Sequence, residues 1–538
     1  MSAAPPIWAI AMDSPASPEP VLVPFGLTAG LPTAVVAFPV MAASDLPTLR
    51  FSDRGWTGEP DDPDAPNEHW PARILDVPAM ERAIPIYPTE TRRSEVNGGE
   101  VILANGDGAL DNLATDWRLA GRMLEVLRGP YRAPFRAARA EFTTVARFRV
   151  AGVAAGTSKL RLPLGSAAAD LTMPVSSIFA GTGDLDGTAD MAGQDKPVRY
   201  GKHINVQPVQ FHPGLLAYML HDGPIQEVSA VHARGTDVTF AGDYPSWPAL
   251  AAAALAEGTY ATCRAAGVLR IGTPTGFLSV NFRGAAPAGF GYLGTAAGIA
   301  AHLLRAPGGI DASRAVAASF AWPAGEVRLD ATGLTVAGAL DRLASGVCGW
   351  WGAGLDGAFR GAVLHRPEAA TPILTIQPWM LSAPPEEVPE SSQGPWYRVR
   401  TTFETLGSVQ TGEDVAGVVS EEYRAYLAQP YRVAPSYSIE TQTRFPGAID
   451  GPLVETAFDT FDDAEDLADE LLRIFAAPRR GWQIGIRPEE AWRFWGVAEP
   501  GAVVSLVWPA VRALQGGRPL VVRAFSARGD RLTLELWG

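Results

Sequence analysis

Residues 347–364 read VCGWWGAGLDGAFRGAVL, and this stretch decides the fold class. Trp350 and Trp351 open a β-strand, Leu355-Asp356-Gly357 supplies a turn, and Phe359 to His365 return as a second strand. Glycine suits such a turn because it adopts a positive φ without steric cost. The stretch therefore predicts a short hairpin, and it contains no catalytic motif.

Other parts of the chain are built in the same way. Short strands joined by glycine turns recur in GGEVILANGDGALDNL (98–113), KPVRYGKHINVQPV (196–209), YMLHDGPI (218–225) and RLTLELWG (531–538). Asp-Gly in the third stretch predicts a hairpin that turns at His221-Asp222-Gly223. In the last stretch, alternation places Leu532, Leu534 and Leu536 on one face of a strand.

Helices interrupt these strands at three places with clear signals. One is expected at about 295–305, and Thr335 heads a second whose Val336, Leu340, Leu343 and Val347 share a face. A third begins at Asp462 as N-cap and ends before Pro478. The fold class is therefore mainly β with α+β insertions. Since no fixed-period repeat is present, solenoids and propellers are disfavoured.

The chain is long enough for several hydrophobic cores. Its 538 residues correspond to roughly three to five domains at about 100–200 residues each. We expect a multidomain protein with these segments: 1–145, β-rich with a proline-rich arm over the first 30 residues; 146–285, β-rich with a short helix; 286–370, α+β; and 371–538, an α+β or β-barrel domain.

The charge and the N-terminal sequence limit the possible partners. A formal net charge of −14 repels a nucleic-acid backbone, although an acidic wall would let DNA slide past without sticking. The first basic residue is Arg50, so no secretory signal is expected. The apolar stretch at 34–43 is too short to span a bilayer and contains Pro39, so we expect a soluble chain.

Taken together and in this order, the strand-and-turn stretches resemble the baseplate hub or tail-tip (distal tail) proteins of tailed bacteriophages. The resemblance covers most of residues 45–538. It implies a structural protein of the virion, made in the host cytoplasm, which caps the tail tube, lines the DNA channel and anchors the tip or fibres. It also implies barrel-like sheets, one before about residue 245 and one after about residue 370.

The same resemblance implies the partners. A homotrimer is favoured and a hexameric ring is second, with the tail tube or distal tail protein on one side and a fibre or tip protein on the other. DNA would only pass through the lumen, and no membrane insertion of the isolated chain is expected. The family implies no enzyme activity, no catalytic residues, no metal and no cofactor.

Several polar clusters are candidates for metal or catalytic sites. Asn105, Asp107, Asp111 and Asp116 partly match a calcium loop, but Leu110 stands where that loop needs glycine, so a turn is predicted instead. His212 and His221 are nine residues apart beside Asp222 and are each interpreted as turn histidines. None of the seven histidines forms a zinc motif.

Two alternative functions stay open at the level of sequence. A tail-associated cell-wall hydrolase would pair Cys263 or Cys348 with His302 or His365, although buried free thiols are the expected state of both cysteines. A host-receptor protein would bind glycan in an exposed aromatic cleft around Trp350 and Trp351. A basic stretch follows the first strands and is interpreted as a protein interface in preference to a DNA site: Arg128, Tyr131, Arg132, Phe135, Arg136 and Arg139.

Overall fold

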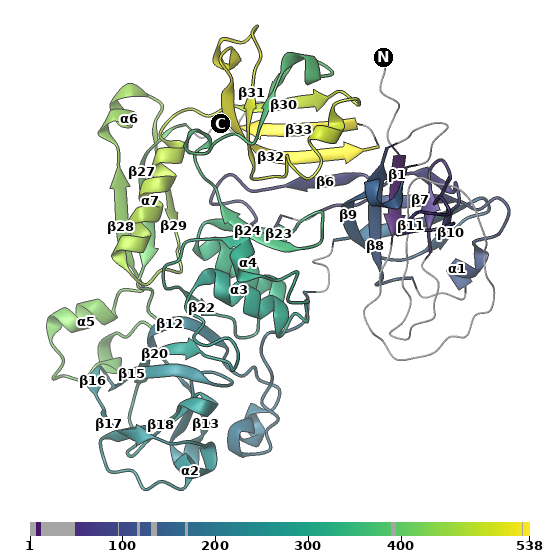
Figure 1. Cartoon of the computed structure of the whole chain (residues 1–538). Coiled ribbons are helices and arrows are strands. Elements are labelled where there is room, and N and C mark those ends of the chain that lie inside the picture. Colours follow the sequence, from purple (N-terminus) through teal and green to yellow (C-terminus); the bar gives the residue numbers. More distant parts are fainter. Residues whose placement is uncertain are drawn as a thin grey trace.

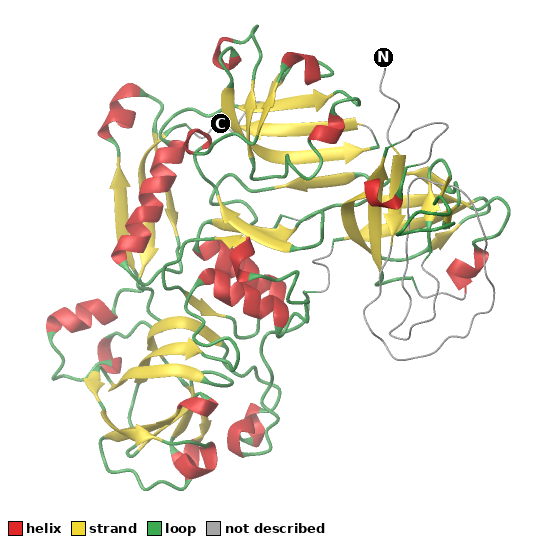
Figure 2. Ribbon diagram, viewed as in Figure 1, coloured by secondary structure: helices red, strands yellow, loops and turns green. Residues whose placement is uncertain are grey.

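The computed structural model describes residues 7–11, 49–94, 96–115, 119–130, 137–166, 171–388, 394–529 and 531–538. Within them the protein is mainly β, with several separate sheets and short helices between them (Figure 2). This confirms the predicted fold class. Most of the predicted proline-rich arm at residues 1–30 lies outside the described residues.

The N-terminal sheet has the order β2-β1-β8-β9-β11-β7-β5, with β10 beside β11. Its strands are β1 (Ile7–Ala11), β2 (Phe51–Ser52), β5 (Ile74–Asp76), β7 (Glu100–Ala104), β8 (Met123–Gly129), β9 (Thr143–Val150), β10 (Ala154–Ala155) and β11 (Lys159–Gly165). A separate pair, β3 (Trp56–Thr57) and β4 (His69–Trp70), packs Trp56 against Trp70 edge to face.

The C-terminal sheet takes one strand from the N-terminal part of the chain. Its order is β25-β31-β32-β33-β30-β26, and β6 (Met80–Ala83) pairs antiparallel with β32. Its other strands are β25 (Leu374–Ile376), β26 (Glu386–Val388), β30 (Gly481–Ile486), β31 (Val503–Leu506), β32 (Arg518–Arg528) and β33 (Arg531–Trp537). The predicted alternation is confirmed, since Leu532, Leu534 and Leu536 are all buried.

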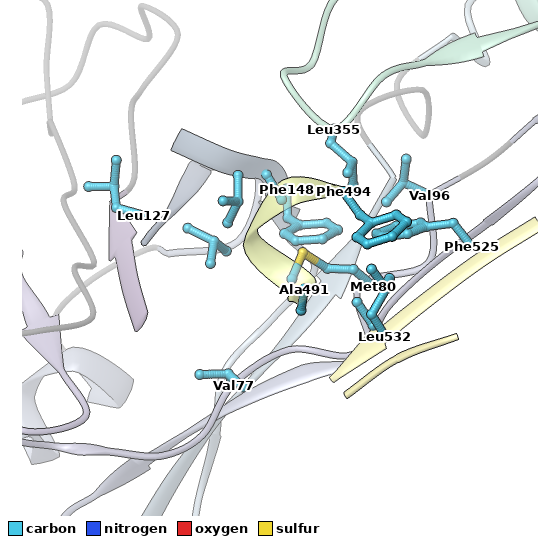
Figure 3. Close-up of a cluster of buried hydrophobic side chains, with 14 of the residues drawn as sticks. Val77, Met80, Val96, Leu127, Phe148, Leu355, Ala491, Phe494, Phe525 and Leu532 are labelled. Atoms are coloured by element: carbon cyan, nitrogen blue, oxygen red, sulfur yellow. The ribbon is translucent and has the colours of Figure 1, made fainter. Parts of the chain in front are cut away.

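One hydrophobic core joins these two sheets. Met80 of β6 lies among Phe148 of β9, Phe494, and Phe525 of β32 (Figure 3). Burial of this continuous apolar surface stabilises the pairing of β6 with β32.

Residues 199–330 form two five-stranded sheets. The first has the order β16-β15-β20-β12-β22 and the second β13-β14-β19-β18-β17. The first contains β12 (Arg199–Val206), β15 (Ile225–Ala233), β16 (Thr236–Asp237), β20 (Leu278–Ala285) and β22 (Arg328–Asp330). The second contains β13 (Val209–His212), β14 (Ala217–Met219), β17 (Thr239–Asp243), β18 (Thr259–Cys263) and β19 (Val268–Ile271).

The hairpin predicted to turn at His221-Asp222-Gly223 is wrong. β14 pairs with β13 and β19, whereas β15 pairs with β16 and β20, so the two strands belong to different sheets. Gly223 does adopt a positive φ of 127°. The turn therefore carries the chain from one sheet to the other, because each flanking strand has another partner that buries its apolar face.

The stretch 347–364 forms the predicted hairpin. β23 (Gly349–Ala353) pairs antiparallel with β24 (Phe359–Val363), and β21 (Phe320–Ala321) lies parallel to β24. Helices α3 (Ala296–Arg305) and α4 (Val336–Gly346) pack beneath it (Figure 1). Thr335 caps α4 as predicted, with its hydroxyl accepting from the Gly338 amide.

The remaining helices are short, apart from the last. They are α1 (Asp111–Thr115), α2 (Trp247–Ala251), α5 (Glu421–Leu427), α6 (Ile439–Arg444) and α7 (Phe461–Phe475). Within the described residues, no helix combines the length and the apolar character needed to cross a bilayer.

Candidate assembly surface

A three-stranded sheet near the periphery of the molecule is covered by a helix on one face (Figure 1). Its order is β28-β27-β29, with β27 (Trp396–Phe403), β28 (Arg432–Tyr437) and β29 (Ile449–Val454). Helix α7 packs on β27 and β28, where Trp396 meets Phe475 at 4.2 Å between ring centroids. The covered face is therefore an ordinary helix-on-sheet core.

The start of α7 differs from the prediction by two residues. Thr460, not Asp462, is the N-cap, and its hydroxyl accepts from the Asp463 amide at 3.2 Å. Asp462 and Asp463 then fall in the first turn, where negative charge suits the helix dipole. The sequence predicts an apolar side for this helix, and the structure buries four of its five members and half-buries Leu467; the four are Ala464, Leu471, Ile474 and Phe475.

The opposite face of this sheet is exposed. Along β28, Ala434 and Ser436 point to α7, whereas Val433 and Tyr437 alternate with them and are 41% and 52% exposed. We call the side chains on this side the open face, and they are Val433, Pro435, Tyr437, Arg398, Arg400, Asp450 and Leu453.

Charged groups order the centre of the open face. Arg398 Nε donates to Asp450 Oδ1 at 2.9 Å, and Arg400 Nη2 donates to Asp450 Oδ2 at 3.2 Å. The hydrogen bond from Arg398 lowers the pKa of the Asp450 carboxyl. The result is a surface with apolar side chains on both outer strands and an ion-paired centre, in which two arginines share one carboxylate and leave one excess positive charge. Apolar side chains around a paired polar centre are typical of a protein contact surface.

The edges of this sheet are partly blocked. Among the described residues β28 and β29 each pair only with β27, and each carries a proline, Pro435 and Pro452. Proline cannot donate to a neighbouring strand, so it discourages edge-to-edge pairing. The open face is consequently better suited to a contact than either edge.

The cysteines are buried free thiols, as predicted. Cys263 belongs to the core around Phe211 and Trp247, while Cys348 and His365 line one cavity. Burial raises the pKa of Cys348 to about 11, and burial also raises that of Cys263. A thiol that stays protonated is a poor nucleophile, so this arrangement does not favour the cysteine hydrolase alternative.

The aromatic cleft predicted for glycan binding is wrong. Trp351 is fully buried, and its indole Nε1 donates to Asp341 at 2.7 Å. Trp350 is 6% exposed and lies under the guanidinium of Arg82 at 5.4 Å. The hairpin turns both rings into neighbouring cores, because its two faces are each covered by other parts of the chain.

The candidate polar residues named from the sequence take structural positions. Asn105 Nδ2 donates to Asp111 Oδ1 at 2.7 Å, and Asp107 pairs with Arg73, as in a closed turn. His212 accepts from the Leu215 amide and His221 from the Arg199 amide. The described part of the chain holds no group of three His, Cys, Asp or Glu suited to a metal ion. Some candidate residues lie outside the described residues: Asp116, Tyr131, Arg132, Phe135 and Arg136.

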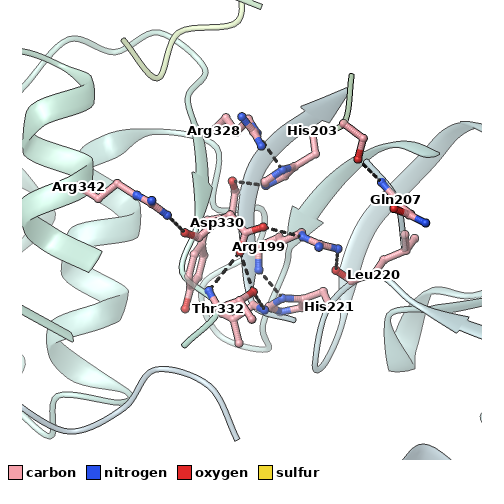
Figure 4. A network of polar contacts seen from close by, with 12 residues as sticks. Arg199, His203, Gln207, Leu220, His221, Arg328, Asp330, Thr332 and Arg342 are labelled. Atoms are coloured by element: carbon pink, nitrogen blue, oxygen red, sulfur yellow. Dashed lines mark hydrogen bonds and ion pairs between the residues drawn. The ribbon is translucent and has the colours of Figure 1, made fainter. Parts of the chain in front are cut away.

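A buried polar network links the two five-stranded sheets (Figure 4). Arg199 of β12 bonds to Asp330 of β22 at 3.0 Å and to the Leu220 carbonyl at 3.2 Å. Although burial opposes ionisation, Arg199 lowers the pKa of Asp330 to about 2. Sequence reasoning missed this network because its members are distant in the chain and form no motif.

His203 lies fully buried in the same network. Its Nε2 lies 3.0 Å from the Tyr200 carbonyl oxygen, and its Nδ1 lies 3.3 Å from Arg328 Nε. The carbonyl can only accept, so Nε2 carries the proton and Nδ1 accepts from Arg328. Burial lowers the pKa of His203 well below its ordinary value. The ring is consequently a neutral structural group.

Comparisons with known proteins give structural neighbours alone. No protein-family model and no curated protein sequence matches the chain. It is similar to the tail protein from Neisseria meningitidis MC58 at 10% identity and a TM-score of 0.39, over 88% of this chain and 94% of that one. It is similar to a chain of the virion of a native gene transfer agent particle at 15% identity and a TM-score of 0.41, over 64% and 84%.

A third neighbour is the 43 kDa tail protein of prophage MuSo2 from Shewanella oneidensis. The identity is 8% and the TM-score 0.37, over 87% of this chain and 95% of that one. These neighbours are described as tail proteins and as a virion. All three TM-scores lie below 0.5.

Proposed function

We propose that the chain is a structural component of a bacteriophage tail, a hub that caps the tail tube at its distal end and anchors the tip or fibres. The open face is the observation that carries this proposal. It presents Val433, Tyr437 and Leu453 to solvent on a sheet whose other face already has its helix. Contact with another protein surface would remove these apolar side chains from water.

The charge of the chain fits the proposed position in the tail. A net charge of −14 disfavours tight binding of DNA, which suits a protein that lets DNA pass through a lumen. We further propose a closed homo-oligomer, with a trimer preferred to a hexamer. In a closed ring every copy of the contact surface is buried against a neighbouring copy, so no surface is left to continue the association.

The experiment is a mass measurement and a low-resolution map of the assembled tail. We expect a closed ring of this 57.0 kDa chain in which each contact buries more than about 2,000 Å² and includes the open face. A single copy per assembled tail would overturn the proposal.

Paired variants test the surface itself. Val433→Glu with Tyr437→Glu places charge on exposed positions of the open face, so folding should be unaffected while ring assembly is lost. The matched control is Leu75→Glu with Ile178→Glu, which changes two residues that are 54% and 58% exposed elsewhere. Equal assembly of the two double variants would contradict the assignment of the open face.

The cavity that holds Cys348 and His365 is where a cysteine hydrolase would have its site. Cell-wall cleavage by the isolated chain, abolished by Cys348→Ser, would establish a hydrolase. We expect no cleavage in a zymogram, because the pKa of the thiol is raised to about 11 by burial.

A further inference from the structure

In a cyclic ring of three or six copies, the two surfaces that meet are different patches of the chain. A patch that contacts a second copy of itself gives a closed pair instead, because the two-fold axis of that contact uses both copies of the patch. The open face therefore needs a different surface of the next copy as its partner. That surface has to present apolar side chains to Val433, Tyr437 and Leu453, which are exposed on the open face.

The charge of the open face sets the second requirement. Arg398 and Arg400 both pair with Asp450, so one positive charge is in excess. The whole chain, in contrast, has a formal net charge of −14. A positive patch on an acidic protein attracts acidic regions of other copies. The partner surface should consequently combine an exposed apolar group with carboxylates that have no counter-charge.

One segment of the chain has both features. Val418 is 85% exposed, the largest exposed fraction among the large hydrophobic side chains of the described residues. Three exposed carboxylates lie within five residues of it in the chain and form no ion pair in the described structure: Glu413, Glu421 and Glu422. We call residues 411–422 the acidic loop.

The acidic loop is held in place by the body of the chain. Val415 is buried, and the Ala416 amide donates to the Arg234 carbonyl at 2.8 Å. Arg234 Nη2 donates to the Glu413 carbonyl at 2.7 Å, and Arg424 Nη2 donates to the Ala416 carbonyl at 2.6 Å. The loop backbone is therefore fixed before any contact forms, which reduces the entropy lost on association.

The two arginines that hold the loop reduce its negative charge without cancelling it. Asp414 adds a fourth carboxylate to the three exposed ones, and its Oδ2 accepts from the Thr411 amide at 3.3 Å. Four carboxylates against the guanidinium groups of Arg234 and Arg424 leave an excess of two negative charges. This excess is opposite in sign to that of the open face.

We propose that the acidic loop of one copy docks on the open face of the next copy, in the ring on which this contact depends. Val418 then lies among the apolar side chains of the open face and is removed from water. The glutamates of the loop face Arg398 and Arg400, which sets the register of the contact. Since each copy has one loop and one open face, the same contact repeats until the ring closes.

Charge reversal on each side tests the contact in the purified full chain. The face-reversed chain carries Arg398→Glu with Arg400→Glu, and the loop-reversed chain carries Glu421→Lys with Glu422→Lys. Each change places like charges against one another, so association should weaken at least about tenfold in analytical ultracentrifugation.

The matched control is Glu59→Lys with Asp61→Lys, which makes the same change of charge at two exposed residues elsewhere. It should associate as the unaltered chain does. The loop-reversed chain alters exposed residues only, so it remains a test if the face-reversed chain does not fold. Association of the loop-reversed chain equal to that of the control overturns the proposal.

An equal mixture of the two altered chains tests whether the surfaces meet each other. The reversed face of one chain is complementary to the reversed loop of the other, and their unaltered surfaces are complementary as well. Association should return, in complexes that contain both chains. Alternating chains can close a ring of six but not of three, so a trimeric ring would return as open complexes. Two folded chains that form no mixed complex overturn the proposal.

The same measurements separate this contact from the proposed function. If Val433→Glu with Tyr437→Glu abolishes the ring while the loop-reversed chain still forms it, the open face remains a ring contact and the acidic loop is excluded as its partner. If the unaltered chain forms no oligomer, the ring itself is overturned, and this contact with it.

Discussion

Acid should weaken the contact between the two five-stranded sheets and so lower the free energy of unfolding, because His221 lies in this contact. The residue is 6% exposed, and its Nδ1 accepts from the Arg199 amide at 3.0 Å. Protonation of Nδ1 would break this bond and place a charge beside Arg199. Burial lowers the pKa of His221 from 6.5 to about 4.

The direction and size of the effect follow from this pKa. Above pH 6.5 His221 is neutral in both the folded and the unfolded chain, so its titration does not change the free energy of unfolding there. Below pH 6.5 the unfolded chain takes up a proton that the folded chain does not, so stability falls until the pH reaches the folded pKa of about 4. Between pH 7.5 and 4.5 this loss amounts to about 2.5 kcal/mol for this single group.

The variant His221→Asn separates this effect from other titrations. The asparagine Oδ1 takes the place of Nδ1 as the acceptor for the Arg199 amide, but it does not titrate. Urea unfolding at pH 7.5 and 4.5 should show an acid-induced loss about 2.5 kcal/mol smaller in His221→Asn than in the unaltered chain. His365→Asn, at an exposed histidine, is the control and should leave the loss unchanged. An unchanged loss in His221→Asn would refute the reasoning.

Three further predictions concern packing. Gly201→Ala should lower the free energy of unfolding in urea by at least about 3 kcal/mol, because φ is +76° and the new Cβ would lie 1.6 Å from a backbone oxygen. Gly106→Ala is the control, since its new Cβ would have nothing within 4 Å, and similar losses in the two variants would contradict this reasoning. Leu340→Ala should lose about 2–5 kcal/mol in the same assay, since the side chain is fully buried in α4, and a loss under about 1 kcal/mol would be inconsistent with that core position. Neither Cys263 nor Cys348 should react with a thiol reagent at pH 8 until the chain is unfolded, when two thiols should appear; fast reaction of the native protein would count against their burial.

The open face was accessible to sequence reasoning only in part. The sequence predicts a strand at about 433–443, and the structure confirms its first part as Arg432–Tyr437. The rest of that range is wrong, since Ser438 caps helix α6 there. Alternation along a strand shows that two faces differ, but it does not show that α7 covers one face and leaves the other to solvent.

Arg92 and its neighbour show what a sequence leaves undetermined about the burial of a charged side chain. Arg92 stands beside Arg93 in an ordinary loop, and no spacing marks either residue. Arg93 pairs with Asp341 of α4, whereas Arg92 is 5% exposed and lies beside the buried Cys348. The difference arises because the segment runs along β23, where adjacent side chains point to opposite sides.

The sequence by itself determined the features that depend only on residues a few positions apart in the chain. The β23–β24 hairpin, the Thr335 cap and the alternation in β33 are of this kind, because glycine, a hydroxyl or period-two spacing selects the local backbone. Tertiary structure alone decided which strands share a sheet. β6 pairs with a strand more than 430 residues later in the chain. β14 and β15 belong to different sheets, although the turn between them has the sequence of a hairpin turn. Such pairings depend on which apolar faces can be buried together across the whole chain, and local sequence carries no information on that.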